Sequence, residues 1–113
     1  MKLPNLEQAY IEERKIIDYL LNDEKSGGKT AFFAAFGFTI VHWETLRTAL
    51  LAHAATYEVT QSVASPHGMK YIIEGTMSTP DERSAKVRSV WIIDTDQTAP
   101  RFVTAYPLEG DAE

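Results

Sequence analysis

The sequence of 113 residues is long enough for one compact domain with a single hydrophobic core and too short for two ordinary domains. Hydrophobic residues make up 44% and charged residues 24%, as in a soluble globular protein, and a formal net charge of −5 gives no general attraction to nucleic acid. Because the chain has no cysteine, disulfides, thiolate zinc sites and a cysteine nucleophile are excluded.

Localisation and cofactor requirements also follow from simple patterns. The apolar runs are only a few residues long, so the sequence predicts no membrane-spanning segment. The first residues, MKLPNLEQAY, lack the apolar middle of a signal peptide, and we expect a cytoplasmic protein. The histidines His42, His53 and His67 do not have the spacing of metal ligands, and we expect neither a metal nor another cofactor.

The first half of the chain carries helical patterns. From Glu12 onward, apolar residues recur four positions apart, which predicts a helix that ends before the loop NDEKSGGK. The pairs are Ile16 with Leu20 and Ile17 with Leu21. The run KTAFFAAF at 29–36 predicts a second, short helix that Gly37 ends, because glycine adopts a left-handed conformation without strain.

A third helix is expected from about Ile40 to Ala54, with Thr39 as its N-cap. One stripe of this helix collects residues at spacings of three and four: Trp43, Leu46, Leu50 and His53. A histidine near the C-terminal end of a helix is usually a partner of the helix dipole or a satisfied group at the edge of the core. It can also transfer protons, so both interpretations of His53 stay open.

After residue 55 the period of the hydrophobic pattern changes from 3.6 to 2. Four strands are expected at 57–64, 69–76, 85–94 and 101–106, with Ser-Pro-His-Gly at 65–68 as a turn. Short connections between consecutive strands predict an antiparallel β-meander, and helices that precede it imply an α+β fold with the N-terminal helices packed on one face of the sheet. We expect a single domain, with a helical part at about 12–55, a sheet at about 57–107 and a frayed tail at 109–113.

The face of the sheet that the helices leave open carries the candidate site. Strict alternation on the fourth strand puts Thr104 and Tyr106 on the opposite face from Arg101. Depending on strand register, Arg88 either clusters with Thr104 and Tyr106 or joins Arg101. The alternative is that these are ordinary solvent-facing residues that favour β structure.

As a site, this set has the chemistry to bind and cleave a phosphodiester. An arginine fork such as that of Arg88 binds a phosphate through two hydrogen bonds, and the hydroxyls of Thr104 and Tyr106 add further ones. Lys29 follows two glycines at the start of a helix, where N–H groups also attract an anion. RNA cleavage without a metal needs such groups together with a proton donor for the leaving oxygen, which Tyr106 or His53 can supply.

Five motifs, taken together, resemble a small bacterial domain family of uncharacterised function over nearly the whole chain. They are DYLLN at 18–22, KTAFFAAFGF at 29–38, WETLRTALLAHA at 43–54, VRSVWII at 87–93 and PRFVTAYPL at 100–108. That family in turn resembles, more distantly, toxin domains of the barnase–EndoU–colicin–RelE class. Those domains combine N-terminal helices with a four-stranded antiparallel sheet, and they are often metal-independent ribonucleases of toxin–antitoxin or polymorphic-toxin systems.

The resemblance implies a ribonuclease-like toxin with an RNA substrate and a cognate antitoxin. It points to Lys29, Arg88, Thr104 and Tyr106 as functional positions, and Arg101 and Lys29 would bind substrate. Relatives commonly carry a histidine just before this lysine, where this chain has Gly28. That departure and the acidic flanks favour the alternative, a non-enzymatic interaction or immunity module that binds a basic partner. An open strand edge also suggests a homodimer.

Overall fold

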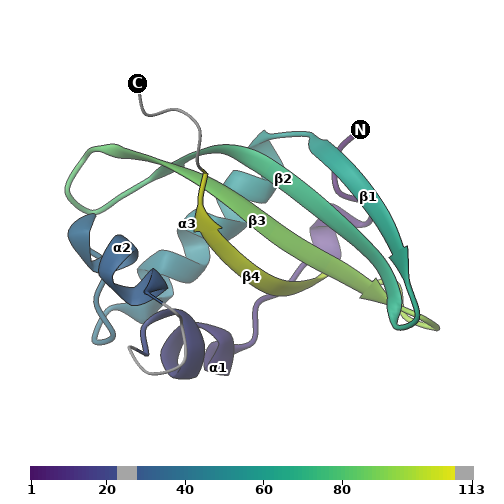
Figure 1. Cartoon of the computed structure of the whole chain (residues 1–113), viewed down its shortest axis with the longest axis horizontal. Helices are drawn as coiled ribbons and strands as arrows, with labels where there is room; N and C mark the ends of the chain where they lie inside the picture. The colour runs from purple at the N-terminus through teal and green to yellow at the C-terminus, as the bar shows by residue number, and fades with distance from the viewer. Residues whose placement is uncertain (23–27, 109–113) are drawn as a thin grey trace.

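A computed structural model describes residues 1–22 and 28–108, and it shows an α+β fold in which helices cover one face of a four-stranded antiparallel sheet (Figure 1). The fold class expected from the sequence is therefore confirmed. The expected frayed tail at 109–113 and most of the expected loop NDEKSGGK, residues 23–27, lie outside the described residues.

The N-terminal segment forms short helical turns. A 3₁₀ turn, η1 (Leu6–Gln8), precedes α1 (Glu13–Lys15), which continues as a π-helical turn, η2 (Ile16–Leu20). The backbone N–H of Leu21 donates to the carbonyl of Ile16 at 2.8 Å, the i to i+5 bond that defines a π turn. Ile16 and Leu20 are fully buried, so this segment is fixed by its apolar face.

Two further helices follow. Helix α2 (Lys29–Ala35) ends before Gly37, whose φ of +96° confirms the expected left-handed position. Helix α3 (Trp43–Thr56) begins three residues later than expected, because the Thr39 hydroxyl accepts from the N–H of His42 in a turn before the helix. In the described part of the chain, no helix is long and apolar enough to cross a bilayer.

The sheet has the order β1-β2-β3-β4, which confirms the meander. Its strands are β1 (Val59–Ser65), β2 (Gly68–Ser78), β3 (Ser84–Asp94) and β4 (Arg101–Pro107). Strands β2 and β3 pair in continuous register over their whole length, so they form the rigid centre of the sheet. Strand β1 is largely exposed and forms one edge.

The hydrophobic core lies between the helices and one face of the sheet. It contains large side chains from every layer: Ile16, Leu20, Phe33, Leu46, Leu50, Ile73, Val87, Trp91 and Phe102. Burying a side chain of this size stabilises the fold by about 1.5–3 kcal/mol before entropy is counted. We call the uncovered side of the sheet the outer face.

The N-terminal arm determines where α1 and η2 lie. Tyr10 pairs with the edge of β4: its N–H donates to the carbonyl of Pro100, and its carbonyl accepts from Phe102, both at 3.0 Å. This pairing partly covers the β4 edge and brings the following helical turns beside β4 (Figure 1). Residues that are far from β4 in sequence therefore border the outer face.

Candidate functional site

A bulge in β4 gathers the polar side chains on the outer face. Val90 pairs with Thr104 whereas Trp91 pairs with Phe102, so β4 carries Val103 as an extra residue. Strict alternation is therefore wrong for β4. Arg101, Thr104 and Tyr106 all share the face of Arg88, and Phe102 and Ala105 face the core. The sequence left open whether Arg88 clusters with Thr104 and Tyr106 or with Arg101, and in the structure it shares a face with all three.

Arg88 lies at the centre of a row that crosses three strands. It is directly opposite Glu74 on β2 and Tyr106 on β4. Its Nε donates to Glu74 Oε2 at 2.7 Å, and its Cζ lies 5.7 Å from the centroid of the Tyr106 ring. Tyr106 first, and then Glu74, raise the pKa of Arg88 above its ordinary value. The guanidinium is therefore held as a fixed cation.

Tyr19 meets the outer face at the next row. Thr104 lies opposite Val90, and its hydroxyl oxygen is 3.1 Å from the hydroxyl oxygen of Tyr19, with which it shares a hydrogen bond. Tyr19 belongs to the π turn, and such turns recur at functional sites because the wider turn redirects a side chain.

Two ammonium groups surround the Tyr19 ring. Lys15 Nζ lies 5.4 Å and Lys29 Nζ 5.5 Å from its centroid. Partial burial by itself raises the pKa of Tyr19, but the hydrogen bond from Thr104 and the charges of Lys29 and Lys15 outweigh it and lower the pKa below its ordinary value. The surroundings of Tyr19 thus favour negative charge on its oxygen.

Lys29 lies beside the Tyr19 ring because contacts with the β2–β3 hairpin hold α2 in place. Arg83 donates to the carbonyl of Ala35 at 2.6 Å and lies over the ring of Phe36, with 4.6 Å from Cζ to the centroid. Asp81 accepts two hydrogen bonds from the Arg83 guanidinium at 2.6 and 2.8 Å. Those bonds and one from Thr79 lower the pKa of Asp81 to about 2.

Arg101 borders an open pocket beside Tyr19. The pocket has a volume of about 390 Å³ and is lined by Arg14, Lys15, Asp18, Tyr19 and Arg101. Asp94 accepts two hydrogen bonds from Arg101, at 2.9 and 3.1 Å, and these lower the pKa of Asp94 and raise that of Arg101. Arg101 therefore joins the same surface as Tyr19, one row beyond Thr104.

His53 belongs to α3 and points to the core side of the sheet, away from the outer face. Its exposed fraction is 2%, and its Nδ1 is 3.3 Å from the hydroxyl of Ser89, which points into the core whereas Arg88 points outward. Trp91 donates to the same hydroxyl at 2.9 Å, and Nε2 of His53 has no hydrogen-bond partner within residues 1–22 and 28–108. Burial lowers the pKa of His53, against smaller opposite effects of backbone groups of Val87 and Gly75. The structure does not bring His53 to the Arg88 row.

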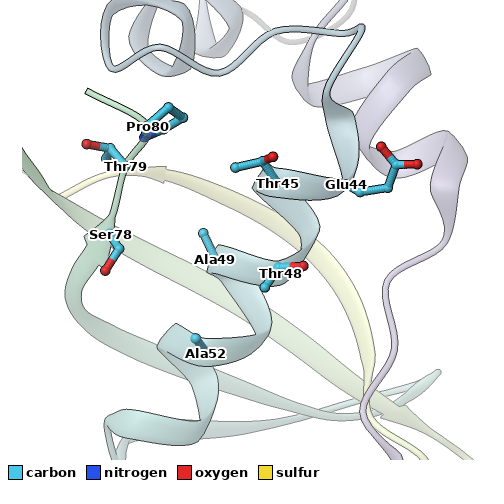
Figure 2. A pocket seen from close by; sticks show the side chains of 8 residues that line it. All are labelled: Glu44, Thr45, Thr48, Ala49, Ala52, Ser78, Thr79 and Pro80. Carbon is cyan, nitrogen blue, oxygen red and sulfur yellow. The ribbon is translucent and has the colours of Figure 1, made fainter. Parts of the chain in front are cut away.

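A pocket somewhat larger than the one beside Tyr19 lies elsewhere and lacks convergent charged groups. It has a volume of about 440 Å³ and lies between α3 and the end of β2. Figure 2 shows Thr45, Ala49 and Ala52 along α3, with Ser78 and Pro80 across from them. Glu44 is the one charged residue among those that line it, so this pocket offers little for phosphate chemistry.

Sequence reasoning missed three members of the outer-face site: Lys15, Tyr19 and Glu74. Tyr19 is separated from Thr104 by 85 positions, and its approach depends on the Tyr10 pairing, for which the local sequence gives no signal. The sequence could in principle have predicted Glu74. Side chains on β2 alternate between the two faces of the sheet, and Glu74 is at an outward position directly opposite Arg88. A carboxylate opposite an arginine is a common cross-strand pair.

The chain is similar in sequence to a protein family and in fold to a solved structure. Residues 2–109 match the family described as Domain of unknown function (DUF6883), and no curated protein matches. A chain of the contact-dependent growth inhibition toxin–immunity protein complex from Klebsiella pneumoniae 342 has the same fold, with a TM-score of 0.71 and 13% sequence identity over 93% of this chain and 97% of that chain. At this identity the likeness concerns the fold alone.

Proposed function

The chain belongs to the DUF6883 family, and we propose that it is the toxin component of a bacterial toxin–immunity pair that cleaves RNA without a metal ion. The observation that carries this proposal is the convergence of Arg88, Thr104 and Tyr106 on one open face, next to Tyr19 and Lys29. A fold shared with a chain of a toxin–immunity complex supports the same class of system.

The charges of the outer face suit a phosphodiester in spite of the acidic composition. Its four strands present four cations there, Lys70, Lys86, Arg88 and Arg101, against the acids Glu74 and Asp94. An arginine binds a phosphate through two parallel hydrogen bonds, and hydroxyls such as those of Thr104 and Tyr106 complete the set. RNA would therefore be attracted locally, even though the chain as a whole repels it.

The ion pair between Glu74 and Arg88 is weak. The side chains of Arg88 and Glu74 remain 37% and 30% exposed, and a partly exposed ion pair of this kind contributes about 0–1 kcal/mol. A phosphate of an incoming strand can replace the carboxylate at small cost. In the free protein, Glu74 would keep the guanidinium oriented toward the position of the phosphate.

Expression in a bacterial host tests this function. Inducing the wild-type chain should arrest growth with loss of intact RNA, and Arg88→Ala should abolish both effects because the main phosphate-binding group is gone. Arg47→Ala is the matched control. Arg47 lies over the Trp43 ring on α3, so its replacement removes the same charge away from the site. Growth without RNA loss in cells that contain well-expressed, folded wild type would contradict an RNA-cleaving toxin.

A second function, an immunity or interaction module, is favoured by two observations of charge. The net charge of −5 and the pairing of Glu74 with Arg88 are also what a protein that binds a basic partner would show. A tagged wild-type chain should then capture one partner in reproducible stoichiometry without harming the host. A pull-down that repeatedly yields no such partner counts against this alternative.

Both functions imply a protein partner. A ribonuclease would act in the cytoplasm, where an antitoxin must restrain it, and the outer face is the surface that such an antitoxin would cover.

A homodimer is a further proposal, and it would form through β1, the strand edge that Tyr10 does not pair with. A concentration-independent monomer mass in solution would contradict the homodimer.

A further inference from the structure

We propose that Tyr19 is a catalytic residue that donates its phenolic proton to the leaving 5′-oxygen of the RNA strand. This inference rests on the proposed function and assigns a role to a side chain that sequence reasoning did not single out. It is carried by the position of Tyr19, by the charges around it and by the state of the other two proton-transfer candidates.

The position of Tyr19 is suited to contact substrate. Its hydroxyl lies 3.1 Å from that of Thr104, on the face that carries Arg88, and its side chain lines the pocket of about 390 Å³ together with Lys15, Asp18 and Arg101. A phosphate held by Arg88 and Thr104 would therefore have Tyr19 beside it, and the open pocket would receive the nucleoside next to the cleaved bond.

The other candidates are less available. His53 is 2% exposed and bonded to Ser89 on the core side of the sheet, so substrate on the outer face does not reach it. The Tyr106 ring carries the Arg88 guanidinium at 5.7 Å from its centroid, which makes it a support for the phosphate-binding arginine. Tyr19 is therefore the candidate proton donor that lies beside Thr104 and lines the open pocket.

Those surroundings stabilise the phenolate that proton donation produces. The ammonium groups of Lys15 and Lys29 lie 5.4 and 5.5 Å from the ring centroid, and the Thr104 hydroxyl can donate a hydrogen bond to the phenolate oxygen. Among the described residues that line the same pocket, Asp18 is the one carboxylate, and it opposes this effect. Two cations against one acid leave the balance in favour of the phenolate.

The proposed step conserves atoms and charge. The 2′-oxygen attacks phosphorus and loses its proton to water, the bond from phosphorus to the 5′-oxygen breaks, and that oxygen takes the proton of Tyr19. The products are a 2′,3′-cyclic phosphate and a 5′-hydroxyl end. The Tyr19 phenolate then regains a proton from solvent, and no oxidant or reductant is involved.

A substrate that needs no proton on its leaving group tests this role. Wild type and Tyr19→Phe are assayed on an RNA oligonucleotide and on uridine 3′-(p-nitrophenyl phosphate), whose leaving group departs as a stable anion. Tyr19→Phe should lower the rate on RNA by about 100- to 10,000-fold, the usual contribution of general acid–base catalysis, but the rate on the p-nitrophenyl ester by less than about threefold.

Tyr57→Phe is the matched control for this experiment. The Tyr57 hydroxyl is 2.6 Å from the hydroxyl of Thr76, so the variant removes a tyrosine–threonine hydrogen bond of the same kind at β2, which β3 separates from the Tyr19–Thr104 contact on β4. It should leave both rates within about twofold of wild type. Circular dichroism melting of both variants confirms that each is folded at the assay temperature.

Failure of the inference differs from failure of the proposed function. Equal losses on the two substrates, or full RNA cleavage by Tyr19→Phe, would remove the proton-donating role and leave the ribonuclease function standing. A folded wild type that cleaves neither substrate would overturn the function itself, and this inference with it.

Discussion

Tyr19 and Thr104 are 85 positions apart in the sequence, and their hydroxyl oxygens lie 3.1 Å apart in the structure. This contact joins the π turn of the N-terminal segment to the edge strand of the sheet. It makes the outer face a composite surface whose chemistry depends on the packing of α1 and η2 beside β4.

Replacing Thr104 by valine removes the hydroxyl and keeps the shape. The pKa of Tyr19 should rise, because the Thr104 hydrogen bond is the strongest influence that lowers it. RNA cleavage should fall about tenfold, the equivalent of one hydrogen bond of about 1.4 kcal/mol. An NMR titration of ¹³C-labelled tyrosine reads the first effect, with Thr76→Val as control. A Tyr19 titration that is the same in Thr104→Val and wild type would refute the coupling.

Glu74→Gln should strengthen binding of a single-stranded nucleic acid, because it frees Arg88 from its carboxylate partner. Single-stranded DNA is the probe, since it lacks the 2′-hydroxyl needed for cleavage, and fluorescence anisotropy should show about three- to tenfold tighter binding. Glu44→Gln on α3 changes the net charge equally and controls for overall charge. Equal gains in both variants would mean that Arg88 has no special role.

His53 should make stability depend on pH near neutrality. Burial holds the pKa of His53 in the folded protein below 6.5, the ordinary value that it has in the unfolded chain. Between pH 6.5 and the folded pKa, the unfolded chain therefore binds more protons than the folded protein does. The stability contribution of the neutral ring is complete above pH 6.5 and is lost as the pH falls through the folded pKa. Urea unfolding at pH 7.5 and 5.5 should show a decrease in the free energy of unfolding that His53→Phe lacks.

His42 supplies the control for that measurement, because it is an exposed histidine outside the core. His42→Asn should retain the wild-type decrease between the two pH values. A decrease of the same size in His53→Phe would show that another group causes it.

Gly75 is required by the packing of Tyr57. A Cβ at position 75 would lie 2.4 Å from the Tyr57 ring, which is well inside contact distance. Gly75→Ala should therefore lower the free energy of unfolding by about 1–3 kcal/mol, the usual cost of overpacking. In a Tyr57→Ala background, Gly75→Ala should lower the free energy of unfolding clearly less. A double-mutant cycle measured by urea unfolding gives both values. Equal costs in the two backgrounds would exclude this steric cause.

Much of the architecture could be predicted because it depends on local periodicity. The change of period near residue 55 separates helices from strands, and short loops between strands leave few alternatives to a meander. The beginning of α3 was misplaced because Ile40 and Val41 continue a helical apolar pattern, although both are exposed in the turn that the Thr39 hydroxyl closes.

The site was predictable only in part, since two irregularities build it. The bulge at Val103 puts Arg101 on the same face as Thr104, and no feature of the sequence around Val103 distinguishes a bulged valine from a regular one. The π turn has a period that a five-residue segment cannot reveal. Both depend on tertiary contacts, which override local pattern and bring Tyr19 to the strand that carries Thr104.

Direct assay of the purified chain tests whether the outer face binds and cleaves RNA. Wild type, Arg88→Ala and Arg47→Ala are incubated with total bacterial RNA in the presence of EDTA, and the fragment ends are analysed. We predict that wild type and Arg47→Ala produce fragments ending in 2′,3′-cyclic phosphates and that Arg88→Ala produces none. Intact RNA with folded wild type, or equal cleavage by Arg88→Ala, would contradict this prediction.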